Sequence, residues 1–416
     1  MNTVPIAPDI LSPEHHADPY ATYRILQEHY PVLYHAPTNS WLVSRHADLV
    51  ALFRDKESFS SDNYSWQLEP VHGRTILQME GREHTTHRRL LNPFFVGNGL
   101  ELFTATIWRV ADELARPWLD QEAGAVARGE RSRGEIDLVP AFTHQFPISV
   151  IEEMLALPKE DHKQFEGWYE SIMDFLTNLE GKPEPIERGL RTRQELAAYF
   201  LPVIAERRGG DGDDLISRFG RAEVDGEQLS DDEIRGFISL MLTAGGETTD
   251  RALASIFKNL LEHPEQLAAV YDDRGLVVDA FVETLRYSPP VHMIMRQTVR
   301  DVEIEGVEIP SGSTITCMLA AANRDPRKFS DPETFNIFRT DNDTSKAFTA
   351  SADHLSFIDG RHFCVGAMLA RNEVDAATNH LLDHMKDLRL REGFVPVEEG
   401  IFTRAPNHLE VTFVPQ

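Results

Sequence analysis

Apolar residues recur at intervals of three and four positions along most of this chain, which is the spacing of amphipathic helices. The pattern predicts a helix over residues 19–29 and a largely helical region, with breaks, over residues 83–208. Two short runs, residues 31–35 and 41–44, have the composition of strands. Residues 61–79 are polar and have no period, which favours an irregular loop that lies over a pocket.

The longest predicted helix covers residues 231–262. Ser230 can cap its first turn, and Glu233 stands at the third helical position, as in a capping box. At 1.5 Å per residue such a helix is roughly 45 Å long and would cross a whole domain. Its apolar middle contains two adjacent glycines, Gly245 and Gly246. A glycine inside a helix costs about 1 kcal/mol relative to alanine, so we expect these two to have a compensating role.

The pattern changes in the C-terminal part of the chain. Residues 302–319 favour strands, a long irregular stretch covers residues 323–359, and a final helix is predicted from about Cys364. Residues 394–415 have the pattern of paired strands. No linker or low-complexity segment separates these parts, so we predict a single domain over residues 1–416, mainly α with a small β-rich part.

Composition narrows the function classes. The 416 residues are 41% hydrophobic and 26% charged, as in a globular protein. The net charge of −26 argues against a nucleic-acid partner, because phosphates would repel this surface. No apolar run reaches the roughly 20 residues of a membrane span, and the N-terminus does not resemble a signal peptide. The chain has two cysteines, Cys317 and Cys364, and Cys317 is expected in the core. We therefore predict a cytoplasmic protein without a membrane anchor.

A ten-residue segment that ends at Gly366 carries the strongest chemical signal. Its sequence, FIDGRHFCVG, fits the pattern F-x-x-G-x-H-x-C-x-G. Cys364 would supply a thiolate, the axial ligand that donates electron density to haem iron and favours O–O cleavage. At the start of a helix the sulfur would receive backbone N–H groups. Gly360 and Gly366 allow tight turns beside a flat macrocycle. Phe357 would shield the sulfur, and His362 would meet a haem propionate.

With this loop, the chain resembles the cytochrome P450 family in its soluble bacterial form, and further family motifs follow in order along nearly the whole chain. Residues 244–249, AGGETT, match the oxygen-activating motif of the central helix. The resemblance implies a local distortion of this helix that opens a groove for dioxygen, which would explain the two glycines. It also implies that Thr248 hydrogen-bonds the oxygen being activated and that Glu247 relays protons from solvent.

Three further matches imply structural and haem-binding roles. Glu283 and Arg286 match the family's E-x-x-R pair, which is buried and holds the haem-binding core. His84 and Arg88 resemble the H-x-x-x-R motif that binds haem propionates, and a solvated basic helix face is the alternative for them. Arg296 matches the family's other propionate-binding arginine.

One position departs from the family. Ile358 stands directly after the phenylalanine of the cysteine loop, where the family usually has glycine. Because a β-branched residue disfavours positive φ, we expect the loop to take another local path there, with thiolate ligation retained.

Family position also implies the lining of a substrate pocket. It should include residues between 61 and 79 and a mainly apolar set of side chains, namely Leu240, Met241, Ala244, Val291, His292, Met293, Ile294, Ile401 and Phe402. Such a lining suits a medium-sized lipophilic organic substrate. His292 either orients a polar group of the substrate or packs in the interior, and the sequence leaves both roles open.

The fold implied is the mainly α prism of the cytochrome P450 family, with haem b between the long central helix and the cysteine loop. The implied activity is a monooxygenase reaction with dioxygen. Electrons would come from NAD(P)H through a separate ferredoxin and an NAD(P)H-dependent ferredoxin reductase. Arg88, Arg89 and Arg361 are candidates for docking an acidic ferredoxin. We expect a monomer.

Three other functions are weighed against this one. A P450-type oxidase that catalyses desaturation or oxidative coupling is compatible with every motif. A peroxygenase would take hydrogen peroxide directly, and a haem sensor would catalyse nothing, so neither would need the acid and alcohol at Glu247 and Thr248. NADH consumption with ferredoxin and the oxygen content of the product separate these alternatives.

Overall fold

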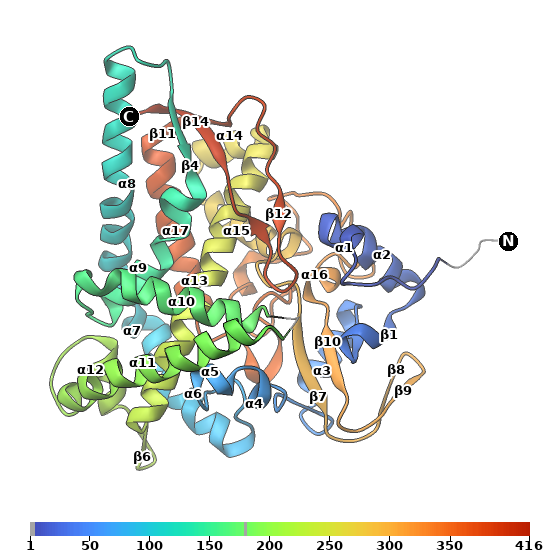
Figure 1. Cartoon of the computed structure of the whole chain (residues 1–416). Coiled ribbons are helices and arrows are strands. Elements are labelled where there is room, and N and C mark those ends of the chain that lie inside the picture. The colour runs from blue at the N-terminus through green and yellow to red at the C-terminus, as the bar shows by residue number, and fades with distance from the viewer. Residues whose placement is uncertain (1–4, 179–180) are drawn as a thin grey trace.

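The long helices and the largest sheet lie on different sides of the molecule (Figure 1). In this computed structural model, which describes residues 5–178 and 181–416, the long helices fill one side. The largest sheet lies on the other side, next to the N-terminal helices, whereas the C-terminal strands lie among the long helices. The central helix α13 (Asp231–Glu262) runs through the helical side from end to end. This arrangement agrees with the predicted mainly α fold.

The helix α13 has the predicted bounds. Ser230 and Glu233 form both hydrogen bonds of the capping box. Its residues are buried on nearly all sides, because α9, α11, α15 and α17 pack around it. A helix that is apolar all round is stable only inside a protein, which explains the weak amphipathic pattern of its sequence.

The other helices surround α13 and cover the sheets. Their bounds are α1 (Pro13–Ala17), α2 (Pro19–His29), α3 (His46–Arg54), α4 (Tyr64–Gln67), α5 (Glu69–His72), α6 (Gly81–Phe95), α7 (Gly97–Glu101), α8 (Thr104–Ala127), α9 (Phe146–Met154), α10 (His162–Leu176), α11 (Pro183–Arg207), α12 (Leu215–Arg221), α14 (Pro264–Asp272), α15 (Leu276–Tyr287), α16 (Leu319–Ala322) and α17 (Ala367–His384).

The largest sheet has the order β1-β2-β10-β7-β3, with β10 parallel to β2 and the other pairs antiparallel. Its strands are β1 (Val32–His35), β2 (Ser40–Val43), β3 (Phe59–Ser60), β7 (Ile294–Thr298) and β10 (Thr314–Cys317). A second sheet has the order β11-β14-β4, and three two-stranded ribbons complete the set. Their strands are β4 (Gly134–Asp137), β5 (Glu223–Val224), β6 (Glu227–Gln228), β8 (Val302–Ile304), β9 (Val307–Ile309), β11 (Met385–Leu390), β12 (Glu398–Glu399), β13 (Ala405–Pro406) and β14 (Glu410–Pro415).

Several elements differ from the predictions. The segment 61–79 was expected to be irregular but contains the short helices α4 and α5. The strands β4 and β7 were not predicted, because neither alternates clearly and each owes its shape to pairing with a distant strand. The helix α17 begins at Ala367, since residues 364–366 form the turn before it. Cys317 is fully buried, as predicted. Among the described residues, no helix has both the length and the apolar character needed to cross a bilayer.

Candidate active site around Cys364

Cys364 lies in a loop that packs against the N-terminal side of the molecule. The Cys364 backbone N–H donates to the Phe357 carbonyl at 2.9 Å, which closes the loop on itself. Gly360 has φ 76°, and a Cβ there would lie 2.6 Å from the Phe53 carbonyl oxygen of α3. Only glycine fits both constraints. Asp359 is held beside it by an ion pair with Arg54, 2.8 Å between Oδ2 and an Nη nitrogen.

Ile358 corrects one prediction about this loop. We expected a β-branched residue at this position to avoid positive φ. The φ of Ile358 is 63°, so the backbone has the left-handed conformation there. Its backbone N–H donates to the Leu355 carbonyl at 2.9 Å, and its side chain lines the cavity next to Cys364. The surrounding hydrogen bonds therefore impose a conformation that costs about 1–3 kcal/mol.

The Cys364 sulfur lies where backbone dipoles converge. Burial raises the pKa of the thiol above its ordinary value, whereas hydrogen bonds from the Gly366 and Ala367 backbone and the charge of Arg88 lower it. These groups favour a thiolate, but burial has the larger effect, so the pKa of the thiol stays above its ordinary value. A positive metal ion at the sulfur would complete the stabilisation, because a coordinating thiol loses its proton. The site therefore fits an iron bound through Cys364.

A cavity of about 210 Å³ separates Cys364 from α13, and we call it the inner hollow. Its lining is mainly apolar and includes, from α13 and the cysteine loop, Phe237, Leu240, Met241, Ala244, Thr248, Phe357, Phe363 and Gly366. Ala244 is exposed to this cavity although it stands in the middle of a buried helix. The predicted residues Leu240, Met241 and Ala244 thus face Cys364 across the space expected for a macrocycle.

Three nitrogen-bearing side chains line the inner hollow: His84, Arg88 and His362. The rings of His84 and His362 lie 4.5 Å apart between centroids. Burial lowers the pKa of His84 to about 4 and also lowers the pKa of His362. Arg88 donates to the Phe363 carbonyl, and no carboxylate of the described residues pairs with it. A half-buried guanidinium without an anion is unfavourable, so this group fits a haem propionate.

Arg296 does not line the inner hollow but lies close to it. Its guanidinium donates to the Met295 carbonyl at 2.8 Å and lies over the rings of Phe53 and Tyr64, 5.6 and 5.9 Å from their centroids. Its charge contributes to the lowered pKa of His362, which places it beside that edge of the cavity.

The glycines of α13 have a packing role. A Cβ on Gly245 or Gly246 would lie 3.0 Å from a side-chain carbon of Ile151 or Ile148, respectively, both on α9. The close approach of α9 is what offsets their cost. The expected distortion of α13 is not present, since the helix is α-helical throughout. Thr248 lines the inner hollow, and its hydroxyl donates to the Ala244 carbonyl at 2.7 Å.

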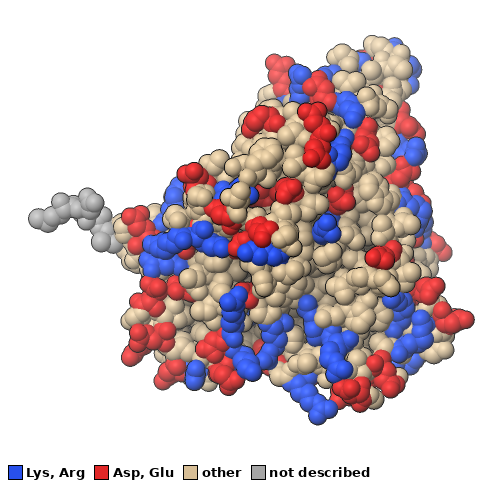
Figure 2. Space-filling view, turned by 180° about the vertical axis from the view of Figure 1, so that it is seen from behind, with Lys and Arg blue, Asp and Glu red and all other residues tan. Residues whose placement is uncertain are grey.

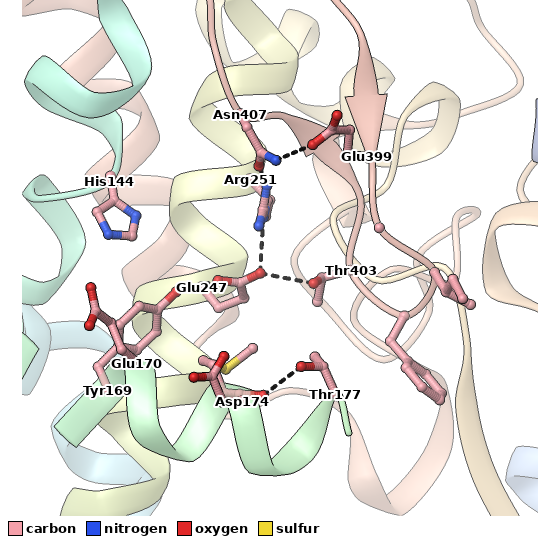
Figure 3. A pocket seen from close by; sticks show the side chains of 14 residues that line it. His144, Tyr169, Glu170, Asp174, Thr177, Glu247, Arg251, Glu399, Thr403 and Asn407 are labelled. Carbon is pink, nitrogen blue, oxygen red and sulfur yellow. Dashed lines mark hydrogen bonds and ion pairs between the residues drawn. The ribbon is translucent and has the colours of Figure 1, made fainter. Parts of the chain in front are cut away.

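Glu247 points away from the inner hollow. It lines a different cavity of about 600 Å³, which we call the polar hollow (Figure 3). Its carboxylate accepts hydrogen bonds from the Tyr169 hydroxyl, from Arg251 Nε at 2.9 Å and from Thr403 Oγ1 at 2.8 Å. Arg251 in turn donates to Asn407. Three elements, α10, α13 and the turn at 400–403, therefore meet at one buried acid.

The partners of Glu247 decide its charge. Burial opposes its ionisation, but the Arg251 charge and the three hydrogen bonds hold its pKa below the ordinary value, so it is a carboxylate at rest. Sequence reasoning did not find Tyr169 or Thr403, which come from distant segments. Arg251 stands four residues after Glu247, and that helical spacing could have signalled the pair.

Glu373 was also missed. It stands on α17, is fully buried and lines the inner hollow. Thr249 Oγ1 donates to its Oε2 at 3.2 Å, while Oε1 has no partner among the described residues. Burial raises the pKa of Glu373 to about 8, so it is mostly protonated at neutral pH.

The remaining predicted pocket residues belong to a third cavity of about 590 Å³, which we call the outer hollow. Met293, Ile294, Ile401 and Phe402 line it, whereas Val291 and His292 line neither this cavity nor the inner hollow. Of the two roles left open for His292, the structure favours packing in the interior. Its Nδ1 lies 2.9 Å from the Tyr23 hydroxyl, and its ring packs on two tyrosines in the interior.

Glu283 and Arg286 form a buried, two-pronged ion pair on α15, with nitrogen–oxygen distances of 2.7 and 2.8 Å. Arg339 also contacts the Glu283 carboxylate, at 2.9 Å. Arg286 donates to the carbonyls of Asn323, Pro332 and Thr334. The pair thus ties α15 to the irregular segment that leads to the cysteine loop.

Several known proteins are similar to this chain in sequence and fold. The sequence model of the family described as cytochrome P450 matches residues 4–408. The pulcherriminic acid synthase of Bacillus subtilis is 38% identical over 405 residues, which are 97% of each chain. The erythromycin C-12 hydroxylase of Saccharopolyspora erythraea is 33% identical over 82% of this chain and 81% of its own. The solved structure of cytochrome P450 CYP109Q5 from Chondromyces apiculatus superposes with a TM-score of 0.84 at 31% identity, covering 98% of each chain. This chain therefore belongs to the cytochrome P450 family, as a monooxygenase whose cofactor is haem b.

Proposed function

We propose that this enzyme inserts one atom of dioxygen into a medium-sized lipophilic molecule of secondary metabolism, with Cys364 as the axial ligand of the haem iron. The observation that carries the proposal is the position of Cys364. Its buried sulfur receives two backbone N–H groups and faces Thr248 of α13 across the inner hollow. A thiolate ligand opposite an alcohol suits the activation of dioxygen.

When bound, haem supplies the iron at which dioxygen is reduced and the O–O bond is cleaved. In the proposal, Cys364 holds that iron, and His84, Arg88, Arg296 and His362 hold the propionates. Phe357, at 9% exposure, packs against Phe363 and keeps water from the sulfur side. The apolar lining of the inner hollow excludes water from the opposite side.

Cleavage of O–O consumes protons, and two adjacent residues of α13 are suited to deliver them. Thr248 faces the inner hollow, and Glu247 faces the polar hollow on the other side of the helix. Glu247 can take up a proton there once its carboxylate separates from Arg251. The Thr248 hydroxyl, once released from the Ala244 carbonyl, can donate its hydrogen into the inner hollow, and its oxygen can accept a replacement proton that originates at Glu247.

Electrons are proposed to come from NAD(P)H through a separate ferredoxin and its reductase. Although the net charge is −26, the face seen in Figure 2 carries several basic side chains along its lower part, where an acidic partner could bind. The three arginines suggested for docking need revision. Arg88 is turned into the inner hollow, and Arg89 and Arg361 are paired with Asp225 and Glu80.

Names of relatives support a substrate from secondary metabolism, since they include an erythromycin C-12 hydroxylase and a cyclomarin C epoxidase. The relative that is 38% identical is named a synthase, so a reaction without oxygen insertion is the second candidate. Product formed under isotope-labelled dioxygen decides between them. Hydroxylation or epoxidation incorporates the label, and desaturation or coupling does not.

The roles of Thr248 and Glu247 are tested by replacing the alcohol. In Thr248→Ala, with ferredoxin, reductase and NADH, electron consumption should continue while product falls and hydrogen peroxide rises. Thr248→Ser keeps the hydroxyl and is the matched control, which should retain coupling. Product formation that stays fully coupled to NADH oxidation in Thr248→Ala would remove the proposed proton delivery.

A further inference from the structure

No described residue that lines the outer hollow has a charged side chain. Twenty described residues line it, contributed by α4, α10, α11, β7, the turn at 401–403 and neighbouring segments, and none is Asp, Glu, Lys, Arg or His. This is unusual for a chain in which 26% of residues are charged, and the adjoining polar hollow contains Glu170, Asp174 and Arg251. A carboxylate or ammonium group buried in the outer hollow would have no counter-ion, which is strongly unfavourable.

Three hydrogen-bond donors among the described lining residues lack a strong acceptor, and one of them, the Trp66 indole N–H, belongs to a side chain that is 59% exposed. The Tyr64 hydroxyl accepts a long contact, 3.5 Å, from Arg296, but no described residue accepts its proton. The Gln67 amide nitrogen donates to the Met295 sulfur, which is a weak acceptor. Tyr64 and Gln67 stand three residues apart on α4 and therefore lie on the same side of it.

The other hydroxyls and amides of the lining are already engaged. Thr177 donates to the Met173 carbonyl, and Thr403 donates to Glu247. Asn178 exchanges hydrogen bonds with the backbone of Lys182 through both ends of its amide. Tyr64 and Gln67 are thus the less exposed donors of the lining that a ligand can use.

Arg296 is the cation nearest to these donors, but it is not part of the lining. Its guanidinium donates to the Met295 carbonyl, and its charge acts on His362 at the edge of the inner hollow. Its guanidinium lies 3.5 Å from the Tyr64 hydroxyl, so a ligand in the outer hollow contacts the phenol and not the guanidinium.

We infer that the substrate is an uncharged molecule with an apolar body and a hydrogen-bond acceptor, such as an amide or ketone carbonyl, held against Tyr64 and Gln67. The inference rests on the proposed function and names its substrate class. The outer hollow has about 590 Å³, which suits a medium-sized molecule. Free fatty acids and amines are disfavoured, because no described residue of the lining offers them a counter-charge.

The test uses two ligands that differ only in the head group, hexadec-9Z-enoic acid, which is anionic, and its neutral primary amide. Before titration, the reduced holoenzyme is exposed to carbon monoxide, and failure to show the red-shifted Soret band of thiolate ligation would count against the proposed function. With that band present, each ligand is titrated above the pKa of the acid, and the substrate-induced Soret shift is recorded. We expect the amide to bind at least about tenfold more tightly than the acid, since burial of an unpaired carboxylate costs more than 1.4 kcal/mol.

Variants of Gln67 and Tyr64 separate charge from hydrogen bonding. Gln67→Lys should gain affinity for the acid, whereas Gln67→Glu should lose it further. Gln67→Leu and Tyr64→Phe should each weaken the amide about fivefold, the value of one hydrogen bond. Equal or tighter binding of the acid to the unmodified enzyme overturns the inference, and so does an amide that produces no shift in an enzyme with intact thiolate ligation.

Discussion

Glu373 gives a prediction whose size can be worked out from the structure. Its carboxyl group lies between α17 and α13, fully buried, with one oxygen accepting from Thr249 and the other unpartnered among the described residues. Burial raises its pKa from 4.5 to about 8. The folded protein therefore keeps a proton on this group that the unfolded chain releases as pH rises through 4.5.

The consequence is a stability that falls as pH rises. Between the unfolded and folded pKa values, the unfolded state binds fewer protons, so the free energy of unfolding decreases by about 1.4 kcal/mol per pH unit. From about pH 5 to about pH 7.5 this amounts to about 3 kcal/mol. With an unfolding entropy of about 2.1 cal/mol/K per residue, a chain of 416 residues converts this loss into about 3.5 °C of melting temperature.

Glu373→Gln removes the titration and keeps the shape of the side chain. Thermal melting of the holoenzyme and the variant at about pH 5 and about pH 7.5, at one scan rate, should show the variant gaining about 3.5 °C relative to the natural protein at the higher pH. Glu392→Gln, at an exposed glutamate, is the control and should leave the difference unchanged. If the melting temperatures of Glu373→Gln and the natural protein differ by the same amount at both pH values, burial does not hold this carboxyl group neutral.

Two further predictions concern the loop and the ion pair that support Cys364. The Ile358→Gly variant should be more stable than Ile358→Ala by about 1 kcal/mol, because only glycine adopts a φ of 63° without strain. Chemical unfolding curves of the two variants measure this difference. A more stable alanine variant would contradict the prediction. The Glu283→Gln variant should lose about 3–5 kcal/mol in the free energy of unfolding, because Arg286 and Arg339 would remain buried without their carboxylate. If its melting temperature stays within about 1 °C of the natural protein's, the ion pair does not support the fold.

The local elements that the sequence predicts most accurately are those whose signals lie within a few residues. The capping box of Ser230 and Glu233 and the apolar middle that follows predict the bounds of α13 as found. The strands β4 and β7 were missed because each is completed by a partner more than a dozen residues away. Short strands of this kind have weak local preference, and pairing decides their conformation.

The same division holds at the site. The spacing of Phe357, Gly360, His362, Cys364 and Gly366 predicts the thiol loop and its cofactor, because a tight loop beside a macrocycle requires these residue types in a fixed order. The sequence does not determine which way a side chain turns once helices pack. Tyr169 and Thr403 draw Glu247 into the polar hollow, and Tyr23 draws His292 into the interior. Those choices, like the positive φ that Ile358 retains, come from contacts between distant segments, which only the folded chain brings together.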